Sequence, residues 1–145
     1  MKKIFLFLFA LSMVLMSCNT SKPTTQMVSD LDGTWKLNYI SGPKIAFKGL
    51  YPDQVPNITF YTKENKFSGS NSCNQYSGLL NVDKNKINFK DAKIAMTMMA
   101  CQGEGDSVYM STLDKIDSYS ISDDGKTLNF IMGDIAVMRF EKTSK

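Results

Sequence analysis

The N-terminal segment limits most strongly what this chain can fold into, because it indicates which residues are removed and which remain to form a domain. Lys2 and Lys3 precede a mainly apolar run over residues 4–16. As a helix this run would be roughly 20 Å long, which is shorter than the apolar layer of a bilayer at roughly 30 Å. A positive start and a short apolar run are typical of a signal peptide, and a buried core helix is the alternative. We therefore expect residues 1–17 to be a signal peptide.

A cysteine ends this segment in a context that resembles the lipobox of bacterial lipoproteins. The context reads Leu15-Met16-Ser17-Cys18, and Met16 is bulkier than the usual residue. The resemblance implies that the Cys18 thiol receives a diacylglyceryl group and becomes the first mature residue. More than one acyl chain gives stable membrane attachment. Because Asn19 rather than Asp follows, we expect a lipid-anchored protein of the bacterial cell envelope, at the outer membrane.

The rest of the chain divides into a tether and one domain. Residues 18–28 are mainly polar and lack aromatic side chains, so they cannot bury enough apolar surface to fold and are predicted to be a flexible tether. Residues 29–145 have the size of one domain with one core. The chain has no histidine, the commonest general base and metal ligand. No basic stripe indicates nucleic-acid binding, and we expect no catalytic residue, metal or cofactor.

Two cysteines remain once Cys18 is assigned to lipid. Cys73 and Cys101 are an even pair in a chain predicted to enter an oxidising compartment, which indicates a disulfide. They do not form a C-x-x-C motif, so a thioredoxin-like redox site has no support. A strand over residues 96–100 is expected to bring Cys101 beside Cys73. The bridge would stabilise the fold by roughly 3.5 kcal/mol, and two buried free thiols are the alternative.

Short alternating segments bounded by turn residues predict β-strands, and Gly133-Asp134 suits a primed turn between the last two. A helix is indicated by Tyr109, Leu113 and Ile116, with Asp106 as its cap. The prediction is a β-rich α+β fold: an antiparallel curved sheet, or a partial barrel or sandwich, of seven to eight short strands with one short helix. The predicted strands cover residues 34–40, 57–61, 66–70, 76–82, 87–89, 119–121, 127–132 and 135–140.

Four stretches carry a further resemblance. They read GTWKL at residues 33–37, PNITF at 56–60, GSNSCNQYSG at 69–78 and TMMAC at 97–101. Together with the helix pattern that follows, they are similar to the META domain, a family also described as HslJ-like. The resemblance implies an antiparallel β fold with one helix, paired cysteines, frequent lipoprotein or secreted placement and an association with envelope stress.

Several motifs admit both a functional and a structural interpretation, and the structural one is favoured. Asn74 more often satisfies turn backbone than faces a ligand, and Gly69 and Gly78 fit a bulge or close packing. Met96, Met98 and Met99 suggest a Cu(I) site, but neither Cys nor His is free to join them, so flexible core filling is favoured. Two carboxylate pairs are interpreted as a hairpin turn and a helix cap; they are Asp123 with Asp124 and Glu104 with Asp106.

Six aromatic residues form the predicted core, although the same pattern would line an acyl-binding groove. They are Trp35, Phe60, Phe67, Tyr76, Phe89 and Phe130. The leading hypothesis is a non-catalytic envelope lipoprotein, attached through the lipid on Cys18, with a structural, stress-related or partner-binding role. The second hypothesis is a carrier of a lipid or hydrophobic peptide, similar to pilotin lipoproteins. An enzyme is the third.

Overall fold

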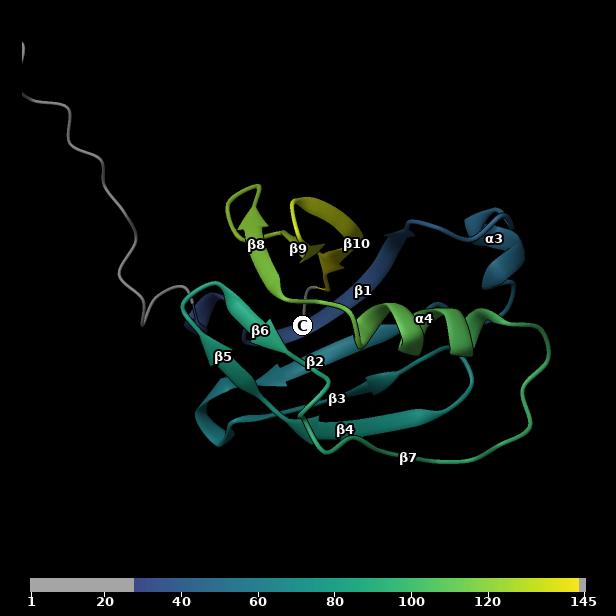
Figure 1. Ribbon diagram of the computed structural model, residues 1–145, viewed down its shortest axis with the longest axis horizontal. Helices are drawn as coiled ribbons and strands as arrows, with labels where there is room; N and C mark the ends of the chain where they lie inside the picture. Colours follow the sequence, from purple (N-terminus) through teal and green to yellow (C-terminus); the bar gives the residue numbers. More distant parts are fainter. Residues whose placement is uncertain (1–27, 144–145) are drawn as a thin grey trace, which may run out of the picture.

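The computed structural model describes residues 28–143, so Cys18 and nearly all of the predicted tether lie outside the described residues. In this part the chain forms one curled antiparallel sheet of ten strands (Figure 1). The elements in chain order are β1 Gly33–Ile40, α3 Phe47–Leu50, β2 Asn57–Tyr61, η1 Thr62–Glu64, β3 Lys66–Ser70, β4 Gln75–Leu79, β5 Asn81–Asp83, β6 Lys86–Asn88, β7 Ala95–Met96, α4 Gly105–Leu113, β8 Ser118–Ser122, β9 Thr127–Met132 and β10 Ile135–Lys142.

The connection between two strands shows how far the sheet curls. The strand order is β5-β6-β8-β9-β10-β1-β2-β3-β4-β7, so β5 and β4 belong to opposite ends of the sheet. In the chain, however, only Leu80 separates them. Because one residue cannot bridge the width of a flat sheet, the two ends must approach each other. The fold is therefore a half-closed barrel, as the prediction of a partial barrel expected.

Two kinds of pairing build the sheet. Local hairpins join β2 to β3, β3 to β4, β5 to β6, β8 to β9 and β9 to β10. The first strand pairs with the last, with Leu37 opposite Phe140, and this contact unites the two halves of the chain. Register shifts lie between Leu37 and Tyr39 and between Ala136 and Met138. Such bulges bend strands and increase their twist, which helps the sheet to curl.

The core lies inside the curl, and α4 packs against it. Tyr109 of α4 is fully buried, with its ring centroid 5.9 Å from that of Tyr76 and 6.5 Å from that of Phe140. These partners belong to β4 and β10, so α4 spans the concave side of the sheet. The six predicted core aromatics are all buried. Several of their rings touch, and Phe89 to Phe130 is 5.3 Å, so they fill the core rather than line a groove.

The sequence prediction of seven to eight strands was wrong, because the structure has ten among the described residues. The segment predicted as one strand over residues 76–82 is two strands, with Leu80 donating its N–H to the Asn65 carbonyl between them. The side chains at positions 76, 80 and 82 all point inward, so the alternation of inward and outward residues continues through the break. The sequence pattern therefore did not reveal that the strand is interrupted. The strand expected over residues 96–100 is reduced to Ala95–Met96.

The helical prediction also needed correction. Besides α4 the described residues contain α3, η1 and a helical segment over residues 28–30. The N-cap of α4 is Glu104, without a side-chain hydrogen bond, and Asp106 lies in the first turn instead of capping it. None of the helices described here has the length and hydropathy that crossing a membrane would require.

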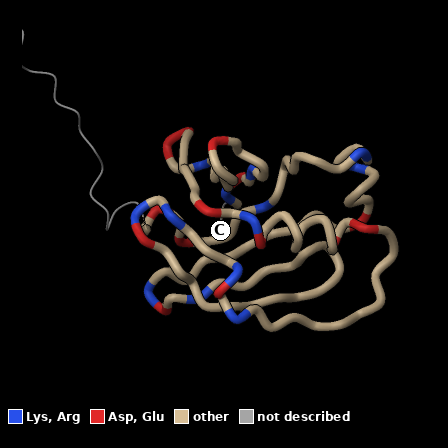
Figure 2. The backbone as a smooth tube through the Cα atoms, viewed as in Figure 1, with Lys and Arg blue, Asp and Glu red and all other residues tan. Residues whose placement is uncertain are grey.

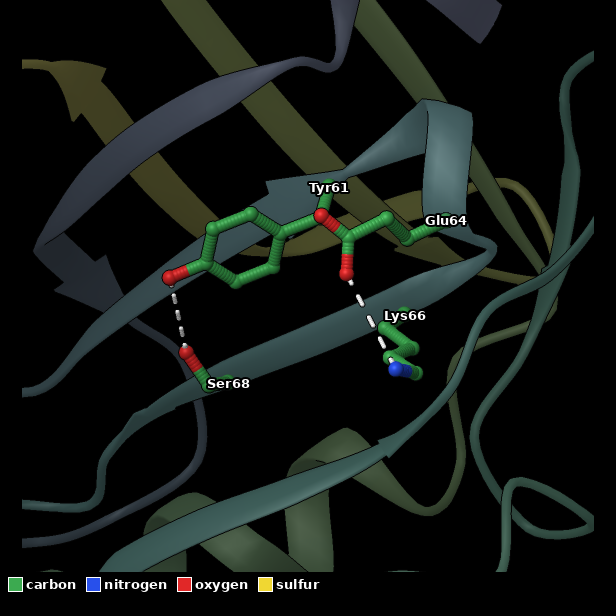
Figure 3. A network of polar contacts seen from close by, with 4 residues as sticks. All are labelled: Tyr61, Glu64, Lys66 and Ser68. Atoms are coloured by element: carbon green, nitrogen blue, oxygen red, sulfur yellow. Dashed lines mark hydrogen bonds and ion pairs between the residues drawn. The ribbon is translucent and has the colours of Figure 1, made fainter.

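Charged residues lie mainly in loops and turns of the backbone, with both signs interspersed (Figure 2). The β2–β3 hairpin gives a typical example. Lys66 Nζ lies 3.8 Å from Glu64 Oε2, and Ser68 Oγ donates to Tyr61 Oη at 3.5 Å (Figure 3). The Lys66 and Glu64 side chains are 60% and 63% exposed. Exposed pairs of this kind contribute about 0–1 kcal/mol, so the fold depends little on them.

Candidate functional site

The disulfide occupies the end of the sheet where β3 turns into β4. Cys73 lies in that turn and Cys101 lies before α4, and their Cα atoms are 5.9 Å apart. This distance falls within the range of about 4.4–6.8 Å that a bridge requires. The structure therefore joins the two cysteines that sequence analysis paired, and it does so although the strand expected to reach Ala100 ends at Met96.

A buried amide shapes the turn that carries Cys73. Asn71 is fully buried, and its Oδ1 accepts hydrogen bonds from the N–H groups of Cys73, at 3.1 Å, and Asn74, at 2.7 Å. Ser72, which lies between Asn71 and Cys73, has φ +90°, in a region that a residue with a side chain rarely adopts. The side chain of Asn71 thus holds a strained turn in place. Sequence analysis missed this residue, although an Asn two positions before Cys73 is a recognisable Asx-turn signal.

A second amide ties this turn to the segment before Cys101. Asn74 Oδ1 accepts from Thr97 Oγ1 at 2.8 Å and from the Met99 N–H at 2.7 Å. Its Nδ2 lies 3.1 Å from Cys101 Sγ and 3.4 Å from the Met99 carbonyl. The side chain is buried, and it satisfies the backbone of the neighbouring segment rather than its own turn. Asn74 is therefore structural, as expected, and replaces the missing strand pairing of residues 97–101.

Close packing explains the glycines of β3 and β4, Gly69 and Gly78, although neither packs against the disulfide. A Cβ atom on Gly69 would meet the Asn57 carbonyl oxygen and lie 2.6 Å from Tyr76 Oη. Tyr76 Oη donates to that carbonyl at 3.0 Å and lies 2.7 Å from Tyr109 Oη. Burial raises the pKa of both tyrosines, so both hydroxyls stay protonated. Gly78 is equally confined, because its Cβ would lie 2.7 Å from the Phe67 ring.

A cavity of about 940 Å³, here called the disulfide cavity, opens beside the bridge. Its walls come from Ile45, residues 49–54, Ser72 with Cys73, and residues 100–104. Its volume is within the range of about 300–1,000 Å³ that is typical of ligand sites. The lining is both polar and apolar, and the N-terminus of α4 lies next to it. Sequence analysis had left the ligand-binding residues unknown, and only the tertiary structure brings these segments together.

Tyr51 is the unusual residue of this wall. Its side chain is 4% exposed, yet its hydroxyl has no hydrogen-bond partner among the described residues. The ring packs edge-on against Phe47, with centroids 5.2 Å apart. Burial, and then the nearby charge of Asp106, raise the pKa of Tyr51 far above its ordinary value. The hydroxyl therefore stays neutral and is a donor without an acceptor, which costs about 1–3 kcal/mol.

A second cavity, here called the hairpin cavity, has a volume of about 600 Å³. It lies between the β5–β6 hairpin and the segment that follows α4. Val82, Ile87 and Ile116 provide apolar lining, and charged residues such as Lys86 and Asp114 also border it. An apolar cavity of this kind is the feature that sequence analysis associated with a carrier.

The predicted use of the three neighbouring methionines as core filling was wrong. Met96, Met98 and Met99 are 44%, 95% and 58% exposed, because no element of the described chain covers β7 and the residues after it. The carboxylate pair Asp123 and Asp124 lies in the β8–β9 turn, with φ +55° and +53°. Among residues 28–143 no group of three or more His, Cys, Asp or Glu side chains is arranged to hold a metal ion.

Comparisons with known proteins agree with this architecture. A family model described as the META domain matches residues 26–145. An NMR structure of a protein from Burkholderia xenovorans is similar with a TM-score of 0.64 and 19% identity, over 90% of this chain and 97% of that chain. A crystal structure of a DUF4847 family protein from Bacteroides vulgatus has a TM-score of 0.52 and 14% identity, over 79% of this chain and 95% of that one.

A second NMR structure is similar with a TM-score of 0.52 and 20% identity, over 84% of this chain and 95% of that chain. No curated protein matches the chain. At these identities the likeness to solved structures shows a shared fold.

Proposed function

This chain belongs to the META domain family, and we propose that it is a non-catalytic, lipid-anchored binding protein of the bacterial cell envelope. The observation that carries the binding role is Tyr51, a residue that lines the disulfide cavity and whose buried hydroxyl has no hydrogen-bond partner among the described residues. Buried polar groups are normally hydrogen-bonded, so an orphan donor at a cavity wall favours an acceptor supplied from outside.

The chemistry of the wall supports binding over catalysis. The raised pKa of Tyr51 keeps its proton at physiological pH, so the hydroxyl donates a hydrogen bond and does not act as a base. The disulfide and the amide of Asn74 hold residues 97–101 in place before a partner arrives. Such preorganisation lowers the entropy that binding would otherwise cost.

A photo-crosslinking residue placed at Gln54, in the cavity wall, tests this role in intact envelopes. We expect discrete adducts from Gln54 and none of the same mass from a crosslinker at Asp123, which lies in the exposed β8–β9 turn. Tyr51→Phe should reduce the adduct yield while leaving stability unchanged or higher, because it removes an unpaired hydroxyl. Adducts that are equally abundant from both positions, or unaffected by Tyr51→Phe, would contradict the proposal.

The membrane anchor is tested independently. The lipobox-like sequence ending at Cys18 supports it, and two or more acyl chains would hold the domain at the bilayer surface. Cys18→Ser should abolish fatty-acid labelling and either release the domain from membranes or stall processing. Palmitate incorporation that is unchanged in this variant would rule out the assignment, whatever the result for the cavity.

A carrier of a lipid or hydrophobic peptide is the second candidate, favoured by the apolar lining of the hairpin cavity. Displacement of a fluorescent fatty acid tests it. Val82→Gln places an amide in the lining and should weaken binding about tenfold, whereas Ile135→Gln, on an exposed hairpin end, should not. Equal binding by the two variants would remove this candidate.

A further inference from the structure

We propose that Met96, Met98 and Met99 form a surface site for a soft monovalent metal ion, with Cu(I) as its natural ligand. The inference goes beyond the proposed function and does not depend on it, because it uses neither the anchor nor a cavity. A methionine side chain usually fills a gap in the core, and these three side chains do not.

The exposed fractions separate these methionines from one in the core. Met98 is 95% exposed and Met99 58%, whereas Met138 of β10 is fully buried. Exposing three large apolar side chains within four residues gives up stabilisation that their burial would supply. A solvent-borne ion can therefore reach the side chains of Met98 and Met99, whereas Met96 is 44% exposed and its sulphur meets the buried amide of Asn71.

The segment that carries the three thioethers is held in place by the buried side-chain amides of Asn74 and Asn71. Asn74 accepts from the Met99 N–H at 2.7 Å and from Thr97 Oγ1 at 2.8 Å, and the Thr97 N–H donates to the Gln75 carbonyl at 3.0 Å. Asn71 Nδ2 donates to Met96 Sδ at 3.4 Å. The disulfide closes the segment at Cys101. The methionines thus extend from a fixed backbone, which lowers the cost of gathering them around one ion.

The spacing allows a shared ion. Along an extended chain the Cα atoms of Met96 and Met99 are at most about 11 Å apart. β7 ends at Met96, and Met98 and Met99 follow within three residues, so the three side chains start from neighbouring points of the chain. Each methionine side chain has three rotatable bonds, so Met99 can turn its sulphur towards the same ion.

The chemistry of the segment selects the kind of ion. Thioethers favour Cu(I), whereas Mg²⁺ and Ca²⁺ require carboxylate and carbonyl oxygens. Residues 94–103 contain no charged side chain, and Figure 2 shows an unbroken uncharged stretch of backbone there. A neutral set of soft ligands does not compensate a divalent charge, but it suits a monovalent soft ion.

Titration of the chain from Asn19 onward tests the site. This chain contains every described element, and its two cysteines are joined, so no free thiol competes for the metal. Ag(I), which has the same soft character and no redox chemistry under these conditions, and Cu(I) held by a chromophoric chelator are the probes. We expect one ion per chain, with perturbed methyl NMR signals for Met96, Met98 and Met99 and no such effect of Zn²⁺.

Matched variants identify the ligands. Met98→Leu should weaken binding of Ag(I) and Cu(I) at least tenfold, and the triple change of Met96, Met98 and Met99 to Leu should abolish it. Met132→Leu, at a methionine that is 41% exposed on another hairpin, should bind as the wild type does. Leucine keeps the size and apolar character, and an unchanged circular dichroism spectrum confirms the fold. Wild-type affinity in the triple variant, or no ion bound by the wild type, would overturn the proposal.

Discussion

The middle of this sheet and its β7 edge are held together by different means. In the middle β9 pairs with β10 through six residue pairs, and Leu128, Phe130, Met138 and Phe140 are all fully buried. At the edge β7 pairs with β4 through two residue pairs, and residues 95–100 are all exposed. Here the chain is retained by a disulfide and by the side chain of Asn74.

The difference shows how a segment that buries no apolar side chains can still be held to the sheet. Burial stabilises an element in proportion to the apolar area that it removes from water. Residues 95–100 remove little, so directional and covalent contacts have to hold them. A surface held in this way keeps its shape while leaving its side chains free for other molecules, which is why both proposals concern this edge.

Truncation inside the apolar middle of the sheet should have the largest effect. Phe130→Ala removes a fully buried ring whose centroid lies 5.0 Å from that of Phe140, and should lower the free energy of unfolding by about 3–5 kcal/mol. Met132→Ala, on the same strand but 41% exposed, should cost less than about 0.5 kcal/mol. Urea unfolding measures both. Similar losses for the two variants would show that packing does not hold the middle of the sheet.

Removal of the bridge should have the next largest effect, concentrated at the β7 edge. Replacing Cys73 and Cys101 together by Ala should cost about 2–5 kcal/mol, and reduction of the wild type should cost a similar amount. Hydrogen exchange should accelerate most for residues 97–104 and least for β9 and β10. Uniform acceleration over the whole sheet would erase the distinction between the middle of the sheet and its β7 edge.

Loss of one amide tests whether hydrogen bonds share this task with the bridge. Asn74→Ala leaves the Met99 N–H and Thr97 Oγ1 without their acceptor, and should lower stability by about 1–3 kcal/mol. The Met99 N–H should then exchange much faster. Asn129→Ala, at an amide that only meets Ser120 Oγ at 3.5 Å on the surface, is the control and should change little.

The smallest effect should be a pH dependence at the β9–β10 turn. Hydrogen bonds from the Gly133 N–H and the Ser118 hydroxyl lower the pKa of Asp117 below its usual value of 3.8. A lowered pKa adds stability that is present above the usual value and lost as the pH falls through the lowered one. The wild type should therefore exceed Asp117→Asn slightly in stability at about pH 5 and lose this advantage as the pH falls through the lowered pKa. A difference that does not change with pH would contradict this reasoning.

Local pattern predicted much of this fold from the sequence. Alternation identified eight strand segments near their observed positions, and the six aromatics assigned to the core are buried. Gly133 has φ +62° in a two-residue turn between β9 and β10, as the Gly-Asp pair indicated. These features are decided by neighbours in the chain, because side-chain direction in a strand and the conformational freedom of glycine are local properties.

Tertiary structure decided the rest. The pairing of β1 with β10 joins the two ends of the domain, and β7 is the last strand with nothing beyond it. The exposure of Met98 and the burial of Asn71 and of the Tyr51 hydroxyl follow from this arrangement. A sequence pattern specifies which face of a segment is apolar, but whether that face is covered depends on elements that are distant in the chain. For that reason the sequence alone predicted the strands and the cysteine pair, and only the folded sheet placed the cavities and the exposed methionines.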